Sequence, residues 1–155
     1  MSEIKHVTVV GAGTMGSQIA LQTALAGPYR VTLVDAVPGQ LERARAQNRK
    51  LLDRSVEKGR LAKEQADAAV ARITDSNDLE EAAKGADLVI EAVIEDFDTK
   101  KSVFTALGKA SRKDAILASN SSTIAIAGSP TSRATRVGAA TCTSSTRSRS
   151  CSCAR

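Results

Sequence analysis

Short runs of aliphatic and β-branched residues alternate along this chain with longer stretches in which apolar residues recur at helical spacing. The short runs have little polar interruption, which is typical of strands buried on both faces of a parallel sheet. They occupy residues 4–10, 30–35, 87–93 and 115–119. Helices are predicted between them, at residues 14–27, 41–58, 63–73 and 98–107. Strands that alternate with helices predict an α/β fold built on a parallel sheet.

The turn after the first predicted strand has the pattern G-x-G-x-x-G. Between a strand and a helix, the first glycine permits a tight turn, the second lets a pyrophosphate approach the backbone, and the third lets the helix pack closely. The free N–H groups at the start of the helix would then face the phosphates. The pattern predicts a Rossmann-type, doubly wound sheet, and a purely structural turn is the alternative. The predicted cofactor contacts are Gly11, Ala12, Gly13, Thr14, Met15 and Gly16.

An acidic residue, Asp35, follows the second predicted strand, 19 positions after Gly16. A carboxylate at this place can accept hydrogen bonds from the hydroxyls of an adenosine ribose, and it would repel a 2'-phosphate. The next residues, Ala36 and Val37, supply no cation to offset that repulsion. We therefore predict NAD rather than NADP as the cofactor. The alternative is that Asp35 caps the following helix.

Together with the glycine turn and Asp35, three further motifs resemble the NAD-binding domain of the L-3-hydroxyacyl-CoA dehydrogenases, a family that includes the 3-hydroxybutyryl-CoA dehydrogenases. These motifs are KGRL at 58–61, DLVIEAVIED at 87–96 and ASNSSTI at 118–124. The resemblance covers residues 4 to about 126, with the motifs in the family's order. It implies oxidation of L-3-hydroxyacyl-CoA to 3-oxoacyl-CoA with NAD, in fatty acid or butanoate metabolism. It also implies an acyl-CoA substrate and a homodimer formed by a helical C-terminal domain.

The resemblance assigns roles to five more residues. Glu95 and Lys100 match positions near the nicotinamide, and the alternative for them is a solvated helix start. Asn120 matches a contact to the nicotinamide ribose and Ser122 a contact to the substrate hydroxyl, although both could belong to an ordinary polar loop. Lys58 matches a position that meets coenzyme A, where the alternative is a solvated surface lysine.

In this family the general base is a histidine that opens a His-Phe-Phe-Asn-Pro segment beyond the SNSS loop. The present sequence has one histidine, His6, inside the first predicted strand, where we expect a structural role. Read in a shifted frame, residues 142–153 can encode a string similar to the family's catalytic segment. We therefore expect a frame slip between about residues 126 and 141, in nature or in the sequencing.

This hypothesis divides the chain into a Rossmann domain at residues 1–126 and a disordered tail at 127–155. The sheet would then be incomplete on its C-terminal side, without the helical domain that completes the acyl-CoA cleft and the dimer. We expect such a chain to bind NAD, weakly at best, and not to turn over. The alternatives are an active dehydrogenase with another base, or a nucleic-acid-binding protein that acts through its tail.

The charge distribution decides how the tail is interpreted. The net charge of +5 comes from five Arg in residues 127–155, which contain no Asp or Glu, so residues 1–126 carry 17 basic and 17 acidic residues. A neutral body argues against a nucleic-acid partner, while the Arg and Ser of the tail keep that alternative open. All three cysteines lie in the tail without a second ligand pair, so we expect neither disulfides nor a metal site. No apolar run could span a membrane and no leader is evident, which predicts a cytoplasmic protein without a membrane partner.

Overall fold

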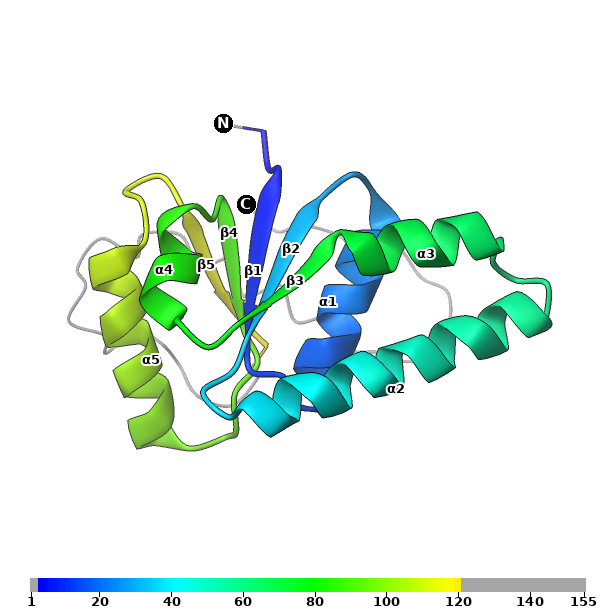
Figure 1. Cartoon of the computed structure of the whole chain (residues 1–155). Helices are drawn as coiled ribbons and strands as arrows, with labels where there is room; N and C mark the ends of the chain where they lie inside the picture. The colour runs from blue at the N-terminus through cyan, green and yellow to red at the C-terminus, as the bar shows by residue number, and fades with distance from the viewer. Residues whose placement is uncertain (1–2, 121–155) are drawn as a thin grey trace, which may run out of the picture.

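The computed structural model describes residues 3–120, which form a five-stranded parallel sheet (Figure 1). The strands are β1 (His6–Val10), β2 (Arg30–Val34), β3 (Ile73–Ser76), β4 (Leu88–Glu91) and β5 (Ile116–Ser119). Their order across the sheet is β3-β2-β1-β4-β5. The chain therefore builds outward from β1 on one side and then crosses to the other side of β1. This order confirms the predicted doubly wound, Rossmann-type fold.

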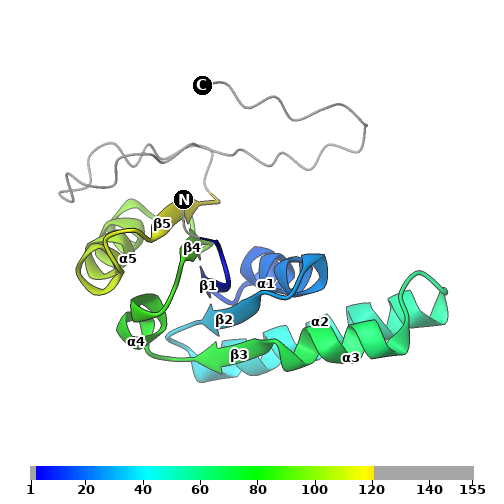
Figure 2. The ribbon, with the colours of Figure 1, turned by 90° about the horizontal axis from the view of Figure 1, so that it is seen from above.

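Five helices cover the two faces of the sheet. They are α1 (Thr14–Ala26), α2 (Pro38–Glu57), α3 (Lys63–Ala71), α4 (Leu79–Lys84) and α5 (Phe97–Ala110). Helices α4 and α5 lie on one face, and α1 and α2 lie on the other (Figure 2). The strand order reverses between β1 and β4, and the helices change face at the same point. In such sheets ligands bind in the crevice at the carboxyl ends of the strands beside this reversal.

Alternate residues of the central strands supply two apolar cores. Val7 and Val9 of β1 pack with Ala20 and Ala24 of α1 in the first core. Val10, which points to the opposite face, packs with Leu107 of α5 in the second core. Fully burying a Val or Leu side chain stabilises a fold by about 1.5–3 kcal/mol. The central strands are therefore held from both sides.

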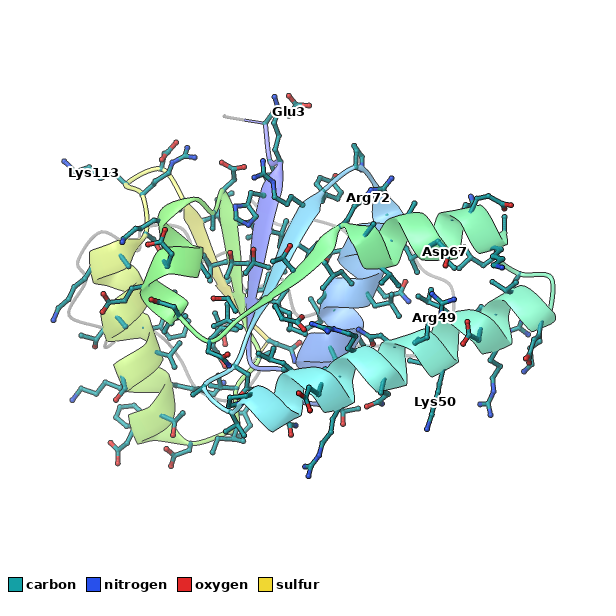
Figure 3. The ribbon with its side chains drawn as sticks, viewed as in Figure 1. Glu3, Arg49, Lys50, Asp67, Arg72 and Lys113 are labelled. Carbon is teal, nitrogen blue, oxygen red and sulfur yellow. The ribbon has the colours of Figure 1, made fainter. Side chains whose placement is uncertain are left out.

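Helices α2 and α3 form an antiparallel pair that extends past the edge of the sheet (Figure 1). Arg49 of α2 and Asp67 of α3 point toward one another across this pair (Figure 3), and a nitrogen of the guanidinium lies 3.0 Å from a carboxylate oxygen. Arg72, after α3, donates to the carbonyl of Ala24 at 3.0 Å and to that of Gly27 at 3.3 Å. Arg72 thus satisfies carbonyls at the end of α1 that have no partner within the helix.

Two elements of the structure were not predicted from the sequence. Strand β3 is polar and only partly buried, since it forms one edge of the described sheet. It therefore lacks the apolar run that identified the other strands, and α3 ends at Ala71 rather than at Ile73. Helix α4 has six residues, too few to show a helical period, although Asp78 caps it by accepting the N–H of Glu81 at 2.9 Å.

Two apolar residues at helical spacing lie outside the buried side of their helices. Leu51 is exposed on α2, and Met15 is 52% exposed at the start of α1. Helix α1 buries its small residues instead, among them Gly16, Ala20 and Ala24. Small side chains on this face let the helix axis approach the sheet, while the larger Ile19 and Leu25 pack at the margin of the first core.

The single histidine of the sequence has a structural role, as predicted. His6 begins β1, at the amino edge of the sheet. One ring nitrogen, Nδ1, lies 2.9 Å from the carbonyl oxygen of Gly85, and Nε2 lies 2.8 Å from the hydroxyl oxygen of Thr32. Both nitrogens are therefore engaged inside the fold. Within residues 3–120, no helix is both long enough and apolar enough to cross a bilayer.

Asp87 holds three segments together at the same amino edge. Its carboxylate accepts the backbone N–H groups of His6 and Lys5, both at 2.9 Å, and a guanidinium N–H of Arg112, also at 2.9 Å. The N–H groups of His6 and Lys5, with Arg112, hold the pKa of Asp87 below its usual value. Because the folded state favours the ionised carboxyl, its contribution to stability is present above the unfolded pKa and is lost as the pH falls through the folded pKa.

Replacing Asp87 by Asn should lower the urea midpoint at neutral pH, because a neutral amide cannot match a carboxylate that accepts three N–H donors. The difference from the wild type should shrink as the pH falls below the pKa of an unfolded Asp, about 3.9, and the wild-type carboxyl takes up its proton. Urea titrations followed by circular dichroism measure both quantities. Asp53→Asn is the control, since it removes an exposed carboxylate that pairs with Arg49 on the same helix. A difference in urea midpoint that stays constant as the pH falls would contradict the role assigned to the ionised carboxylate of Asp87.

Candidate functional site

The hydrogen-bond ladders continue one residue past the strands at the carboxyl edge, the lower edge of the sheet in Figure 1. Each residue that follows β1, β2, β4 or β5 donates its N–H to the last carbonyl of a neighbouring strand, at 2.7–3.2 Å. These four residues are Gly11, Asp35, Ala92 and Asn120. The sheet therefore places three residues predicted from separate motifs in a single row, on both sides of the point where the strand order reverses.

The glycine turn leads from β1 into α1 with little free space except at its middle glycine. Gly11 has a φ of +101°, and a Cβ there would lie 2.6 Å from the carbonyl oxygen of Ala92. A Cβ on Gly16 would lie 1.7 Å from the carbonyl oxygen of Gly11. A Cβ on Gly13 would meet no atom within 4 Å. Two glycines are therefore required by the fold, whereas Gly13 leaves open space next to the backbone.

Helix α1 starts without a side-chain cap. Its N-cap is Gly13, no side chain accepts a hydrogen bond there, and the first turn contains no acid. The first hydrogen bond inside the helix runs from the N–H of Ser17 to the carbonyl of Gly13 at 3.0 Å. The N–H groups of residues 14–16 and the positive end of the helix dipole are thus available to an anion beside Gly13.

Asp35 is half-buried at the end of β2, and backbone groups orient its carboxylate. One oxygen accepts the N–H of Ala12 at 2.8 Å, and the other accepts the N–H of Val37 at 2.9 Å. Val37 is the N-cap of α2, so the alternative that Asp35 caps this helix is wrong. An ionised carboxylate offers about four acceptor positions. The positions that remain after these two bonds can accept a pair of ribose hydroxyls.

On the other side of the row, a buried ion pair joins β4 to α5. Glu91, the last residue of β4, is fully buried and accepts the ammonium of Lys100 on both carboxylate oxygens, at 2.9 and 3.0 Å. The same carboxylate accepts the N–H of Val93 at 2.9 Å and the hydroxyl of Ser119 at 2.6 Å. Only 6% of the Lys100 side chain is exposed, so the alternative of a solvated lysine is wrong.

Two acids flank this pair in the turn before α5. Glu95 is 55% exposed, and its carboxylate lies 3.8 Å from the Lys100 ammonium. Asp96 caps α5 by accepting the hydroxyl of Thr99 at 2.6 Å and its N–H at 2.8 Å. These hydrogen bonds hold the pKa of Asp96 below its usual value. The turn therefore carries negative charge, and Lys100, which lies close to Glu95, is also paired with Glu91.

The other predicted residues lie in different places. Asn120 stands in the row with an exposed side chain, and Ser122 lies outside the described residues, as does the tail at 127–155. Lys58 follows the last residue of α2 and is exposed. It lines a groove of about 430 Å³ between α1 and α2, together with Arg54 and Arg60. The structure thus brings the cofactor residues together at the carboxyl edge, while Lys58 lies apart along the helices.

The sequence analysis did not single out Glu91 or Ser119 as individual residues, although both lie within quoted motifs. A signal for Glu91 was present, because an acid in the apolar run DLVIEAV must be paired if the run is a buried strand. Its partner could not be read from the run, since Lys100 lies on the next helix and Ser119 on the next strand. Breaking a buried pair by removing one partner costs about 3–5 kcal/mol.

The residues of this edge fit NAD. The open space at Gly13 and the uncapped α1 provide a place for a pyrophosphate, and Asp35 can accept ribose hydroxyls and would repel a 2'-phosphate. Within residues 3–120, no three His, Cys, Asp or Glu side chains are grouped so that they could hold a metal ion. Backbone amides and one acid at this edge are thus arranged so that they can hold a dinucleotide.

Comparison with known proteins agrees with this site. The family model described as "3-hydroxyacyl-CoA dehydrogenase, NAD binding domain" matches residues 6–137. A probable 3-hydroxybutyryl-CoA dehydrogenase of Bacillus subtilis is 40% identical over 124 residues, which cover 80% of this chain and 42% of that protein. A 3-hydroxybutyryl-CoA dehydrogenase of Mycobacterium tuberculosis is 39% identical over 124 residues, or 79% of this chain and 43% of that protein. The chain thus spans less than half the length of these relatives.

Solved structures give the same result. The crystal structure of 3-hydroxybutyryl-CoA dehydrogenase from Escherichia coli K12 matches with a TM-score of 0.76 and 34% identity, over 81% of this chain and 26% of that chain. The structure of (S)-3-hydroxybutyryl-CoA dehydrogenase from Ralstonia eutropha matches with a TM-score of 0.76 and 35% identity, over 80% of this chain and 43% of that chain. The family match and these relatives indicate NAD as the cofactor.

Replacing two of the glycines by alanine should affect different properties, NAD binding in one case and stability in the other. Gly13→Ala should fold normally, because its Cβ meets no atom within 4 Å, yet it should weaken NAD binding by roughly tenfold or more because the pyrophosphate needs that space. Gly16→Ala should lower the free energy of unfolding by about 2 kcal/mol or more, because its Cβ would overlap the carbonyl oxygen of Gly11. Calorimetry with NAD measures the effect on binding, and urea unfolding measures the effect on stability. Wild-type NAD affinity in Gly13→Ala would place the pyrophosphate elsewhere.

Proposed function

This chain belongs to the 3-hydroxyacyl-CoA dehydrogenase family, and we propose that it supplies the NAD-binding part of a reaction that oxidises L-3-hydroxyacyl-CoA to 3-oxoacyl-CoA. The observation that carries this proposal is the row at the carboxyl edge. Gly11, Asp35 and Asn120 come from motifs far apart in the sequence, and the ladders bring them to the same edge of the sheet. The open space at Gly13 lies in the turn that begins in this row.

Each part of the edge has a separate task in this proposal. The amides at the start of α1 hold the pyrophosphate, and Asp35 orients the adenosine ribose. NAD, when bound, accepts a hydride from C3 of the substrate. Glu95 and Asn120 stand on the β4 and β5 side of the row, where they would orient the nicotinamide half. In the groove between α1 and α2, Lys58 would attract a phosphate of coenzyme A.

The proposed reaction also needs a group that removes the proton of the substrate hydroxyl. His6 does not suit this task, because it lies at the amino edge of the sheet and both its ring nitrogens are hydrogen-bonded. It is also the one histidine in the sequence. We therefore propose that the 155-residue polypeptide binds NAD without turning the substrate over, as the frame-slip hypothesis implies.

Asp35→Asn tests the proposed cofactor site. The variant should bind NAD about 10- to 100-fold more weakly, since a hydrogen bond to a charged group contributes about 1.5–3 kcal/mol. It should also discriminate less against NADP, because the repulsion of the 2'-phosphate is removed. Calorimetry with both dinucleotides measures these effects. Asp67→Asn is the control, since Asp67 lies on α3 in the exposed helix pair and its loss should leave NAD binding unchanged (Figure 3).

The absence of turnover has its own test. The 155-residue chain, mixed with NAD and 3-hydroxybutyryl-CoA, should form NADH no faster than a mixture without protein, while calorimetry shows that NAD binds. The Bacillus subtilis relative is the positive control for the assay. NADH formation by this chain that Asp35→Asn abolishes would show that another residue serves as the base.

A further inference from the structure

The end of β4 holds three charges that lie close together. The buried carboxylate of Glu91 contacts the Lys100 ammonium at 2.9 and 3.0 Å, and the Glu95 carboxylate lies 3.8 Å from the same ammonium. Two of the three groups are acids, so the cluster carries one net negative charge. Glu91 and Lys100 are buried, whereas Glu95 is 55% exposed. The negative charge that faces outward is therefore that of Glu95.

The topology places this cluster at one end of a bound dinucleotide. Asp35 stands beyond β2, and the cofactor crosses the point where the strand order reverses, between β1 and β4. When the adenosine lies beside Asp35, the nicotinamide half extends over β4 and β5. Glu91 ends β4, and its carboxylate accepts a hydrogen bond from Ser119, the last residue of β5.

The nicotinamide ring carries a positive charge when oxidised and none when reduced. We propose that Glu91 is a positioning residue that neutralises Lys100, so that Glu95 acts on the nicotinamide and favours the oxidised cofactor relative to the reduced one. This inference rests on the proposed NAD site and adds a control of its redox preference. Removing Glu91 would leave Lys100 free to cancel the charge of Glu95.

The size of the effect follows from Coulomb's law. One elementary charge at about 8 Å, in a medium with an effective dielectric constant of about 30 to 60, changes the relative affinity of charged and neutral rings by roughly three- to tenfold. A tenfold change in the ratio corresponds to a shift of about 30 mV in the potential of the bound cofactor. The effect should decrease as salt is added, because the site is open to solvent.

The test compares dissociation constants of oxidised NAD, NADH and ADP-ribose for the full chain and three variants. In Glu91→Gln the ratio of the NADH constant to the NAD constant should fall by roughly three- to tenfold, because Lys100 then offsets Glu95. In Lys100→Met the ratio should rise, since Glu91 keeps the N–H of Val93 and the hydroxyl of Ser119 as donors. In the double variant both charges are gone, and the ratio should return to the wild-type value.

ADP-ribose separates this effect from structural damage, because it lacks the nicotinamide ring. Its affinity should stay within about twofold of wild type in every folded variant, whereas a distorted crevice would weaken all three ligands. Glu81→Gln is the matched control, since it removes the same charge from an exposed pair with Lys84 on α4. Its ratio should equal that of the wild type.

Every outcome bears on the inference. If Glu91→Gln fails to fold, Lys100→Met must still raise the ratio and the double variant must restore it. Equal ratios in the wild type, Lys100→Met and the double variant overturn the role of Glu91, while ADP-ribose binding still supports the proposed function. If the folded wild type binds none of the three ligands, the proposed function fails and the inference fails with it.

Discussion

Helix α1 begins so close to the end of β1 that its first turn has no room for a side chain at the contact. The distance of 1.7 Å between a Cβ on Gly16 and the carbonyl oxygen of Gly11 measures this approach. The same contact continues along the helix through Ala20 and Ala24, both fully buried. Because the small face of α1 fixes the helix against the sheet, the helix start is directed at the crevice. The place proposed for the pyrophosphate is thus a consequence of packing.

The two sides of the crevice are ordered in different ways. On the β2 side, both oxygens of Asp35 accept backbone N–H groups, so the carboxylate is oriented before any ligand arrives. On the β4 side, the carboxylate of Glu91 is buried and must be compensated in full. It receives an ammonium, a backbone N–H and a hydroxyl from three different segments. This pairing ties α5 and β5 to β4 and fixes the edge on which the nicotinamide half is proposed to lie.

Much of the fold could be predicted because the central strands are apolar runs and the glycine turn has a fixed pattern. The strands at 30–35 and 115–119 are confirmed to within a residue. Burial of β2 explains its apolar composition, whereas β5 keeps a short apolar run although it is only partly buried at an edge of the described sheet. Strand β3 and helix α4 could not be predicted in this way, because one is a polar edge and the other is too short for a period. Such elements depend on their neighbours more than on their own composition.

The sequence predicted a list of residues for the candidate site, and the contacts among them could be predicted less well. Sequence spacing identified Asp35, but the bond to the Ala12 N–H depends on the ladder that sets β1 beside β2. Lys100 was placed near the cofactor by resemblance, and its pairing with Glu91 depends on where α5 packs. A contact between residues on different elements is fixed only when the elements are in place. The charge at the carboxyl edge is therefore a property of the assembled sheet. The same residues in another strand register would produce a different charge distribution.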